Sequence, residues 1–167
     1  MEEGNPETLP SNIVRDIAPY QDQLMVATQT GVCLFNPQTG KCQQLFKDSK
    51  EGRKIAMVAD VEVDNNGTLW IAATGEGIFS YRFDTNKLTN YRHDGTQAHS
   101  LSNNNVNNIM QDSKGNLWFS TSGSGLDLYR SATNDFENFD KGKNGLVSDC
   151  IYDTQESPVS GKLILIT

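Results

Sequence analysis

The sequence lacks any apolar run of the roughly 20 residues that a membrane-spanning helix requires. Its first ten residues have neither the basic nor the apolar stretch of a secretory signal, so we expect this segment to contain no targeting signal of its own. Basic residues are also few, since 14 Lys and Arg stand against 21 Asp and Glu, a formal net charge of -7. Because nucleic-acid binding needs clustered Lys and Arg to neutralise phosphates, we expect no nucleic-acid partner.

Cysteine is scarce as well, with only Cys33, Cys42 and Cys150, and no pair has the C-x-x-C spacing of metal or redox sites. An odd number leaves at least one thiol unpaired. In a hairpin that turns at residues 37–40, Cys33 and Cys42 lie diagonally on one face, about 7 Å apart. That separation is too large for an unstrained disulfide. All three cysteines are therefore predicted to be small hydrophobic core residues.

A unit of about 47 residues recurs along the chain, and a period of this length is typical of propellers and solenoids. The corresponding leucines are separated by 45, 48 and 46 residues: Leu24, Leu69, Leu117 and Leu163. The predicted units cover approximately residues 9–55, 56–100 and 101–144, with an incomplete fourth unit at 145–167.

Within each unit the pattern is that of strands rather than helices. In the second unit an alternating Val-Glu-Val run at residues 61–63 meets an Asp-Asn-Asn-Gly turn at 64–67, and a second strand follows at 69–74. A glycine corner follows at 75–77, and then two more strands. Four strands at a fixed period favour a propeller blade over a sandwich. The predicted fold is therefore all-β, a β-propeller fragment of about three and a half four-stranded antiparallel blades.

Trp70 and Trp118 occupy the same place in their units, where the first unit has Met25 and the fourth has Ile164. We expect each of these apolar residues to pack between neighbouring blades, which favours a shared packing role over ligand stacking.

The third unit resembles the two-component regulator propeller repeat. The residues that carry the resemblance are Asn108, Asp112, Gly115, Leu117, Trp118, Phe119, Thr121, Gly125 and Leu126, preceded by Leu101, Ser102, Asn104 and Val106. The resemblance is good in the second unit and loose in the first, where Met25 replaces the tryptophan. That repeat fills the extracytoplasmic sensor region of hybrid histidine kinases typical of gut Bacteroidetes.

This resemblance implies a periplasmic, non-catalytic sensor segment of a membrane-anchored hybrid histidine kinase, with an oligosaccharide ligand and no cofactor. In such proteins about seven blades close one propeller, and a pair of propellers precedes an immunoglobulin-like domain, a membrane helix and the kinase. The chain thus corresponds to about half of one propeller. Two copies would supply about seven units, so we expect self-association.

Few residues suggest chemistry. His93 and His99 have no acidic or cysteine neighbours at metal-ligand spacing and are expected to be solvated loop residues. The turns at 64–67 and 112–115 lack the distal ligands of calcium loops. The corner at 123–125 is neither a nucleophile elbow nor a phosphate cradle, because a strand follows it.

No catalytic, metal-binding or cofactor-binding residue is therefore predicted, and no ligand-binding residue is assigned. The glycine corners and inter-unit loops such as 92–105 are the surfaces we favour for recognition, because loops on a rigid scaffold commonly carry it. Two alternatives stay open. One is a scaffold or adhesion propeller, and the other is a propeller lyase or lactonase, which would need metal-binding side chains converging on the central axis.

Overall fold

The computed structural model describes residues 5 and 7–167, which form four antiparallel sheets and two short helical segments. The first sheet contains β1 (Val14–Tyr20), β2 (Gln23–Thr28), β3 (Gly31–Asn36) and β4 (Lys41–Gln44). The second contains β5 (Val58–Val63), β6 (Thr68–Ala73), β7 (Gly77–Arg82) and β8 (Lys87–Tyr91). The third contains β9 (Val106–Gln111), β10 (Leu117–Thr121), β11 (Leu126–Arg130) and β12 (Asp135–Phe139). The fourth has β13 (Asp153–Glu156) and β14 (Leu163–Ile166).

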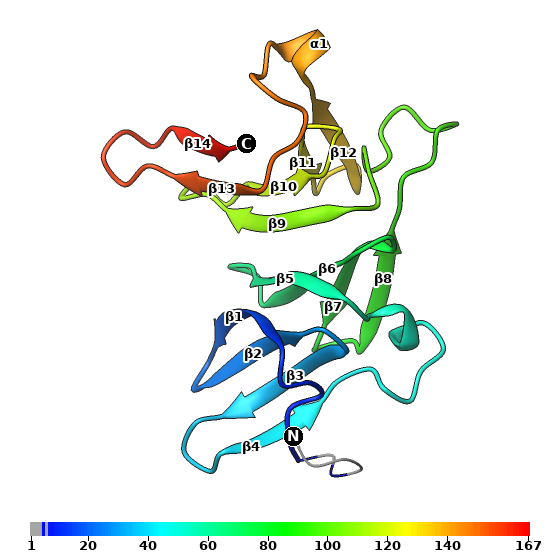
Figure 1. Ribbon diagram of the computed structural model, residues 1–167, viewed down its shortest axis with the longest axis vertical. Coiled ribbons are helices and arrows are strands. Elements are labelled where there is room, and N and C mark those ends of the chain that lie inside the picture. The colour runs from blue at the N-terminus through cyan, green and yellow to red at the C-terminus, as the bar shows by residue number, and fades with distance from the viewer. Residues whose placement is uncertain (1–4, 6) are drawn as a thin grey trace.

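Each four-stranded sheet is a meander whose strands pair in chain order, and the sheets follow one another from the N-terminal to the C-terminal end (Figure 1). The first strands of the sheets are neighbours, with β1 beside β5, β5 beside β9 and β9 beside β13. This is the arrangement of propeller blades around an axis, and it confirms the predicted fold class. The sequence pattern did not predict the two helical segments, η1 (Gly52–Lys54) and α1 (Lys141–Asn144).

The turns between the first two strands of a sheet form as their sequences predict. Asp64 accepts hydrogen bonds from the backbone N–H groups of Asn66 and Thr68, each at 2.9 Å, and Gly67 has a φ of 73°. Such a side-chain cap followed by a residue at positive φ is a normal way to close a hairpin. The turn reading of this segment is therefore confirmed.

The same aspartates have a second role that the sequence pattern did not reveal. The indole N–H of Trp70 donates to Asp64 Oδ2 at 2.9 Å, and that of Trp118 donates to Asp112 Oδ2 at 3.0 Å. In the first sheet Met25 stands in place of the tryptophan, and the turn is shortened so that Tyr20 pairs directly with Gln23. The turn aspartate thus binds an indole in the second and third sheets, whereas the short turn of the first sheet contains Asp22 and no tryptophan follows it.

The core consists of apolar layers between successive sheets. Trp70 is 3% exposed and contacts Tyr129 and Phe119 of the next sheet, which confirms its packing between blades. Trp118 is only half-buried and contacts Phe139 of its own sheet. The ring that covers Trp70 comes from a third strand, and the fourth sheet has two strands, so the inter-blade packing of Trp118 stays a prediction.

A polar contact repeats along the first strands of the sheets. Asp16 Oδ2 accepts from the Val61 N–H at 3.2 Å, and Asp60 Oδ2 accepts from the Ile109 N–H at 2.5 Å. Asn108 Oδ1 then accepts from the N–H of Thr154 in the fourth sheet at 3.1 Å. Since each side chain reaches the backbone of the next sheet, these contacts fix the register between neighbouring sheets.

Two of the three cysteines behave as predicted. Cys33 and Cys42 are buried and free, and they lie diagonally in the hairpin, because Phe35 pairs with Cys42. Burial, followed by the neighbouring Cys42 thiol, raises the pKa of Cys33. Cys150 is free but only half-buried, so the core role predicted for it is wrong. It lies in the loop before β13, where its backbone bridges to Ser122.

Candidate functional site

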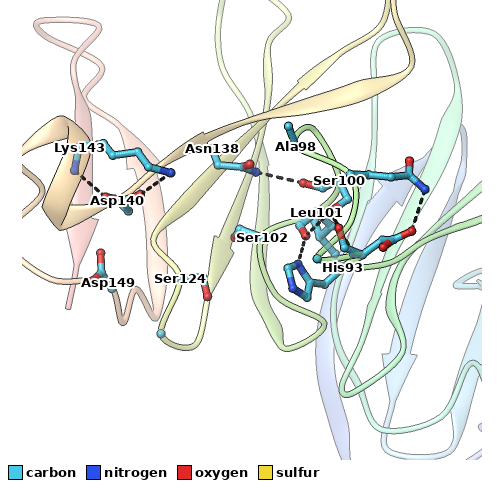
Figure 2. A pocket seen from close by; sticks show the side chains of 14 residues that line it. His93, Ala98, Ser100, Leu101, Ser102, Ser124, Asn138, Asp140, Lys143 and Asp149 are labelled. Carbon is cyan, nitrogen blue, oxygen red and sulfur yellow. Dashed lines mark hydrogen bonds and ion pairs between the residues drawn. The ribbon is translucent and has the colours of Figure 1, made fainter.

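A pocket of about 380 Å³ lies where three loops converge, and we refer to it as the loop-face pocket (Figure 2). It lies between loop 92–105, the glycine corner 122–125 and the segment 138–149. Its volume is within the usual range for small-ligand pockets. The side chains labelled in Figure 2 are His93, Ala98, Ser100, Leu101, Ser102, Ser124, Asn138, Asp140, Lys143 and Asp149.

Loop 92–105 is held firmly at both ends. The guanidinium of Arg92 is paired with the carboxylate of Glu76 and donates to the Gly75 carbonyl at 3.1 Å. At the other end Leu101 is fully buried in the layer between the second and third sheets. A buried anchor of this kind removes much of the freedom that an exposed loop would otherwise have.

Inside the loop, Asp94 organises a tight turn. Its carboxylate accepts the Thr96 N–H at 2.9 Å and the Gln97 side-chain amide at 2.8 Å. The hydrogen bonds from Thr96 and Gln97 lower the pKa of Asp94, because they favour its charged form. The imidazole Nδ1 of His93 is 2.9 Å from the Leu101 carbonyl, so the histidine side chain also helps to shape the loop.

The glycine corner is fixed by the next inter-unit segment. The N–H groups of Gly123 and Gly125 both donate to the Asp149 carbonyl, at 3.0 and 2.7 Å. A Cβ on Gly125 would lie 2.0 Å from the Phe139 carbonyl oxygen, and its φ is 81°. Only glycine fits this position. The corner thereby presents Ser124 to the pocket on a rigid backbone.

The third wall is the short helix α1 and its cap. Asp140 accepts the Lys143 N–H at 2.6 Å, and the Lys143 ammonium lies 3.4 Å from the same carboxylate. These contacts hold the pKa of Asp140 below its usual range, the backbone hydrogen bond being the main cause. The Lys141 N–H donates to Asp149 Oδ1 at 2.6 Å, which joins the helix to the segment beyond it.

Asp127 lies buried in the third sheet and supports the pocket. It accepts the Ser102 N–H at 2.9 Å and the Asn138 amide at 2.7 Å. Burial is the main cause that raises its pKa, to about 6, against the opposing effect of these hydrogen bonds. The equivalent residues of the first and second sheets are Cys33 and Phe79, by strand register. A buried carboxylate thus replaces an apolar residue only in the third sheet, beside this pocket.

The pocket is suited to hydrogen bonding with a polar ligand. It offers hydroxyl, amide, carboxylate and ammonium groups, and most of its carboxylates already hold structural contacts. His93 and His99 are both exposed, as predicted. His93 lines the pocket, and His99 belongs to loop 92–105 without lining the pocket. Within the part of the chain that the structure describes, no group of three or more His, Cys, Asp or Glu is placed to hold a metal ion.

Loop 92–105 and a glycine corner, which the sequence favoured separately, meet at this one pocket. The residues that sequence reasoning missed belong to segment 138–149, namely Asn138, Asp140, Lys143 and Asp149. One signal for the site was present in the repeat itself. Asp127 interrupts an otherwise apolar position of the unit, and a comparison of units at that position would have directed attention to the third sheet.

Residues 100–123 match the family described as two component regulator propeller. No curated protein matches the chain. Among solved structures, the extracellular domain of the putative hybrid two component system BT3049 from B. thetaiotaomicron is similar over 99% of this chain, with 22% identity and a TM-score of 0.82. The corresponding domain of BT4673 from the same organism matches over 94%, with 21% identity and a TM-score of 0.72. PorZ of Porphyromonas gingivalis, a surface component of the type-IX secretion system, matches over 91%, with 14% identity and a TM-score of 0.53.

The chain spans only 23%, 20% and 30% of those three solved chains, so it corresponds to a part of each. At identities this low, the structural similarity establishes a shared fold and not a shared function. The family match falls on the third unit, from the inter-unit loop through the tryptophan strand to the glycine corner, which is where the sequence resemblance is strongest. Residues 100–123 of this chain thus match a two-component regulator propeller repeat, within a propeller fold like that of extracellular domains of hybrid two-component systems.

Proposed function

We propose that this chain is a non-catalytic, ligand-binding part of the periplasmic sensor region of a membrane-anchored hybrid histidine kinase, and that its ligand is an oligosaccharide. The single observation that supports this most is the position of the matched repeat. Residues 100–123 include both the end of loop 92–105 and the start of the glycine corner that shape the loop-face pocket.

The chemistry of the loop-face pocket agrees with a neutral polyhydroxylated ligand. The Ser124 hydroxyl can donate and accept hydrogen bonds, and Lys143 can donate. The amide N–H groups of Asn138 are bonded to Ser100 and Asp127, which leaves its carbonyl oxygen as an acceptor. The carboxylates of Asp94 and Asp140 accept hydrogen bonds that hold their own loops, which argues for a binding role rather than a proton-transfer role. No helix in the described residues is long and apolar enough to cross a membrane.

Calorimetric titration with a panel of neutral oligosaccharides tests this proposal. We expect at least one to bind, and Ala98→Trp to abolish binding, because Ala98 is exposed and lines the pocket. Lys143→Glu is expected to weaken binding, whereas Lys114→Glu is the matched control on an exposed turn outside the pocket. Absence of binding across the panel, or unchanged binding by Ala98→Trp, would contradict the proposal.

We also propose that two copies associate end to end. The exposed apolar residues Ile17 and Ile164, each 52% exposed, lie at opposite ends of the row of sheets. Asp153 occupies the place in β13 that Asp60 occupies in β5, so it is positioned to accept a backbone N–H from a further first strand. Sedimentation equilibrium should give a dimer, and a stable monomer at high protein concentration would exclude this arrangement.

A further inference from the structure

A second pocket, of about 580 Å³, lies between the second and third sheets, and we refer to it as the wedge pocket. It is lined at the turns 64–66, 82–87 and 131–134. The glycine corners join the second strand of a sheet to the third. The turns at the wedge pocket join the first strand to the second and the third to the fourth, so in an antiparallel sheet they lie at the opposite end of the strands. The wedge pocket is therefore separate from the loop-face pocket.

The pocket exists because two side chains are small where the first interface has large ones. Strand register places Ser80 opposite Trp70 as it places Leu34 opposite Met25. Ser131 likewise follows the Tyr-Arg pair of the third sheet at the position of Phe83 in the second.

In the first interface both large residues fill the wedge. Leu34 packs on the apolar layer, and the ring of Phe83 stacks on Tyr20 with centroids 4.7 Å apart. Side chains of that size occupy the space that corresponds to Ser80 and Ser131. The pocket of about 430 Å³ between the first two sheets is lined by Phe46, Tyr81, Asn86 and Leu88 instead. The second interface has the same backbone geometry with two serines, so a hollow results.

Aromatic side chains make the inner wall of the wedge pocket rigid. Tyr91 and Tyr129 both donate their hydroxyls to Asn134 Oδ1, each at 2.8 Å. Trp70 lies behind them, 5.8 Å from Tyr91 and 4.8 Å from Tyr129 between ring centroids. Aromatic rings of this kind suit the apolar face of a sugar ring.

The polar side of the pocket has unused hydrogen-bonding capacity. Among the described residues, the hydroxyls of Thr68, Ser80 and Thr89 have no hydrogen-bond partner, although all three line the pocket. Ser80 is only 7% exposed as a residue, but its hydroxyl is accessible to solvent through the pocket. Because these hydroxyls hold no bond within the protein, a ligand can bond to each of them without breaking an internal contact.

One of the two cations at the mouth of the pocket has no ion pair. Lys87 makes no ion pair among the described residues, whereas the other cation, Arg82, is bound by Asp84 at 2.7 Å. The nearby Asp64 has both carboxylate oxygens occupied by its turn and by Trp70. A free ammonium beside hydroxyls and rings fits a ligand with a carboxylate.

From this chemistry we infer that the wedge pocket binds a hexuronate, the carboxylate-bearing ring of an acidic sugar. Its ring hydroxyls bond with Thr68, Ser80 and Thr89. Its apolar face lies on Tyr91 and Tyr129, and its carboxylate pairs with the ammonium of Lys87. This site is additional to the loop-face pocket and does not depend on it.

Calorimetry with glucuronate and galacturonate, against glucose and galactose, tests the inference. We expect one or both hexuronates to bind about tenfold more tightly than the neutral sugars, because an ion pair is added, and the difference to shrink in high salt. Lys87→Ala should reduce hexuronate affinity to the neutral level. Lys41→Ala is the matched control, since Lys41 holds the same strand position in the first sheet.

Ser80→Leu and Ser131→Phe place in the second interface the residues that fill the first, and both should abolish binding while the unfolding transition stays cooperative. Equal affinity for neutral and acidic sugars would overturn the inference, as would unchanged binding by a folded Ser80→Leu variant. Ala98→Trp, which blocks the loop-face pocket, should leave hexuronate binding intact. Loss of binding in that variant would assign the hexuronate to the other pocket.

Discussion

The first and second inter-sheet interfaces share one backbone plan and differ in what fills it. The first uses Met25, Leu34 and Phe83, and its wedge is filled with apolar side chains. The second uses Trp70, fixed by its hydrogen bond to the turn aspartate, and has serines farther out. A repeat can therefore keep its architecture while the side chains at each interface shape different pockets.

The two interfaces are alike at their inner edge, where the first strands of the sheets lie side by side. Asp16 reaches from the first sheet to Val61, and Asp60 reaches from the second sheet to Ile109. The differences are confined to the outer strands and to the loops, where Asp127 also supports the loop-face pocket. The inner strands keep the sheets in register, and the outer strands and loops are where one unit differs from another.

Removal of the central tryptophan should have the largest effect. Trp70→Ala leaves a large cavity and deprives buried Asp64 of its indole partner, so we expect a loss of about 4 kcal/mol in the free energy of unfolding. Urea denaturation measures it. Trp118→Ala is the control, and it should cost about half as much because that indole is half-buried. Equal losses would show that the packing of Trp70 against the third sheet adds nothing to the free energy of unfolding.

Opening the first interface should have a smaller effect. Phe83→Ser removes a ring that stacks on Tyr20 and meets Tyr81 edge to face, and the expected loss is about 2 to 3 kcal/mol. The reciprocal change Ser131→Phe should leave stability within about 1 kcal/mol, because the wedge pocket has room for the ring. Strong destabilisation by Ser131→Phe would mean that the two wedges differ in more than these side chains.

The architecture could be predicted from sequence because it depends on a period, on turn residues and on strand alternation, all of which are local. Gly67 and Asp64 show their role within four residues of chain. The pockets could not be predicted in the same way. Their walls come from residues such as His93 and Lys143, which lie 50 positions apart, and the wedge pocket depends on Ser80 and Ser131 being small relative to counterparts in another sheet.

Charge at the inner edge should make stability depend on pH. Burial, followed by the nearby Asp16, raises the pKa of Asp60 from 3.8 to about 8, and burial with Asp16 and Asp64 raises the pKa of Glu62 to about 7. A raised pKa means that the folded state retains protons that the unfolded chain releases above pH ~4. Stability is therefore full below that pH and falls as pH rises toward 8.

Asp60→Asn tests this dependence. The amide keeps the shape of the carboxyl group and has no charge to desolvate, so we expect the variant to gain on the order of 1 kcal/mol over the parent at pH 8 and nothing at pH 4. Urea denaturation across this range measures it. Asp84→Asn is the control on an exposed carboxylate. A variant that is less stable than the parent at pH 8 would show that the charged form is the one the second interface needs.

The smallest expected difference concerns two equivalent asparagines, both at positive φ. Asn86 accepts only the hydroxyl of Tyr81 in its own sheet, whereas Asn134 accepts Tyr129 of its own sheet and Tyr91 of the neighbouring one. Glycine tolerates their φ values of 52° and 57°, so Asn86→Gly and Asn134→Gly remove the hydrogen bonds without backbone strain.

Asn134→Gly should therefore cost about 1 kcal/mol more than Asn86→Gly, the contribution of one inter-sheet hydrogen bond. Urea denaturation of both variants measures this difference, and Tyr91→Phe should reduce it because the inter-sheet donor is then already absent. Equal costs for the two glycine variants would mean that the contact from Tyr91 adds nothing to the second interface. The two interfaces would then differ in packing alone, and the inner wall of the wedge pocket would depend on ring contacts without help from this hydrogen bond.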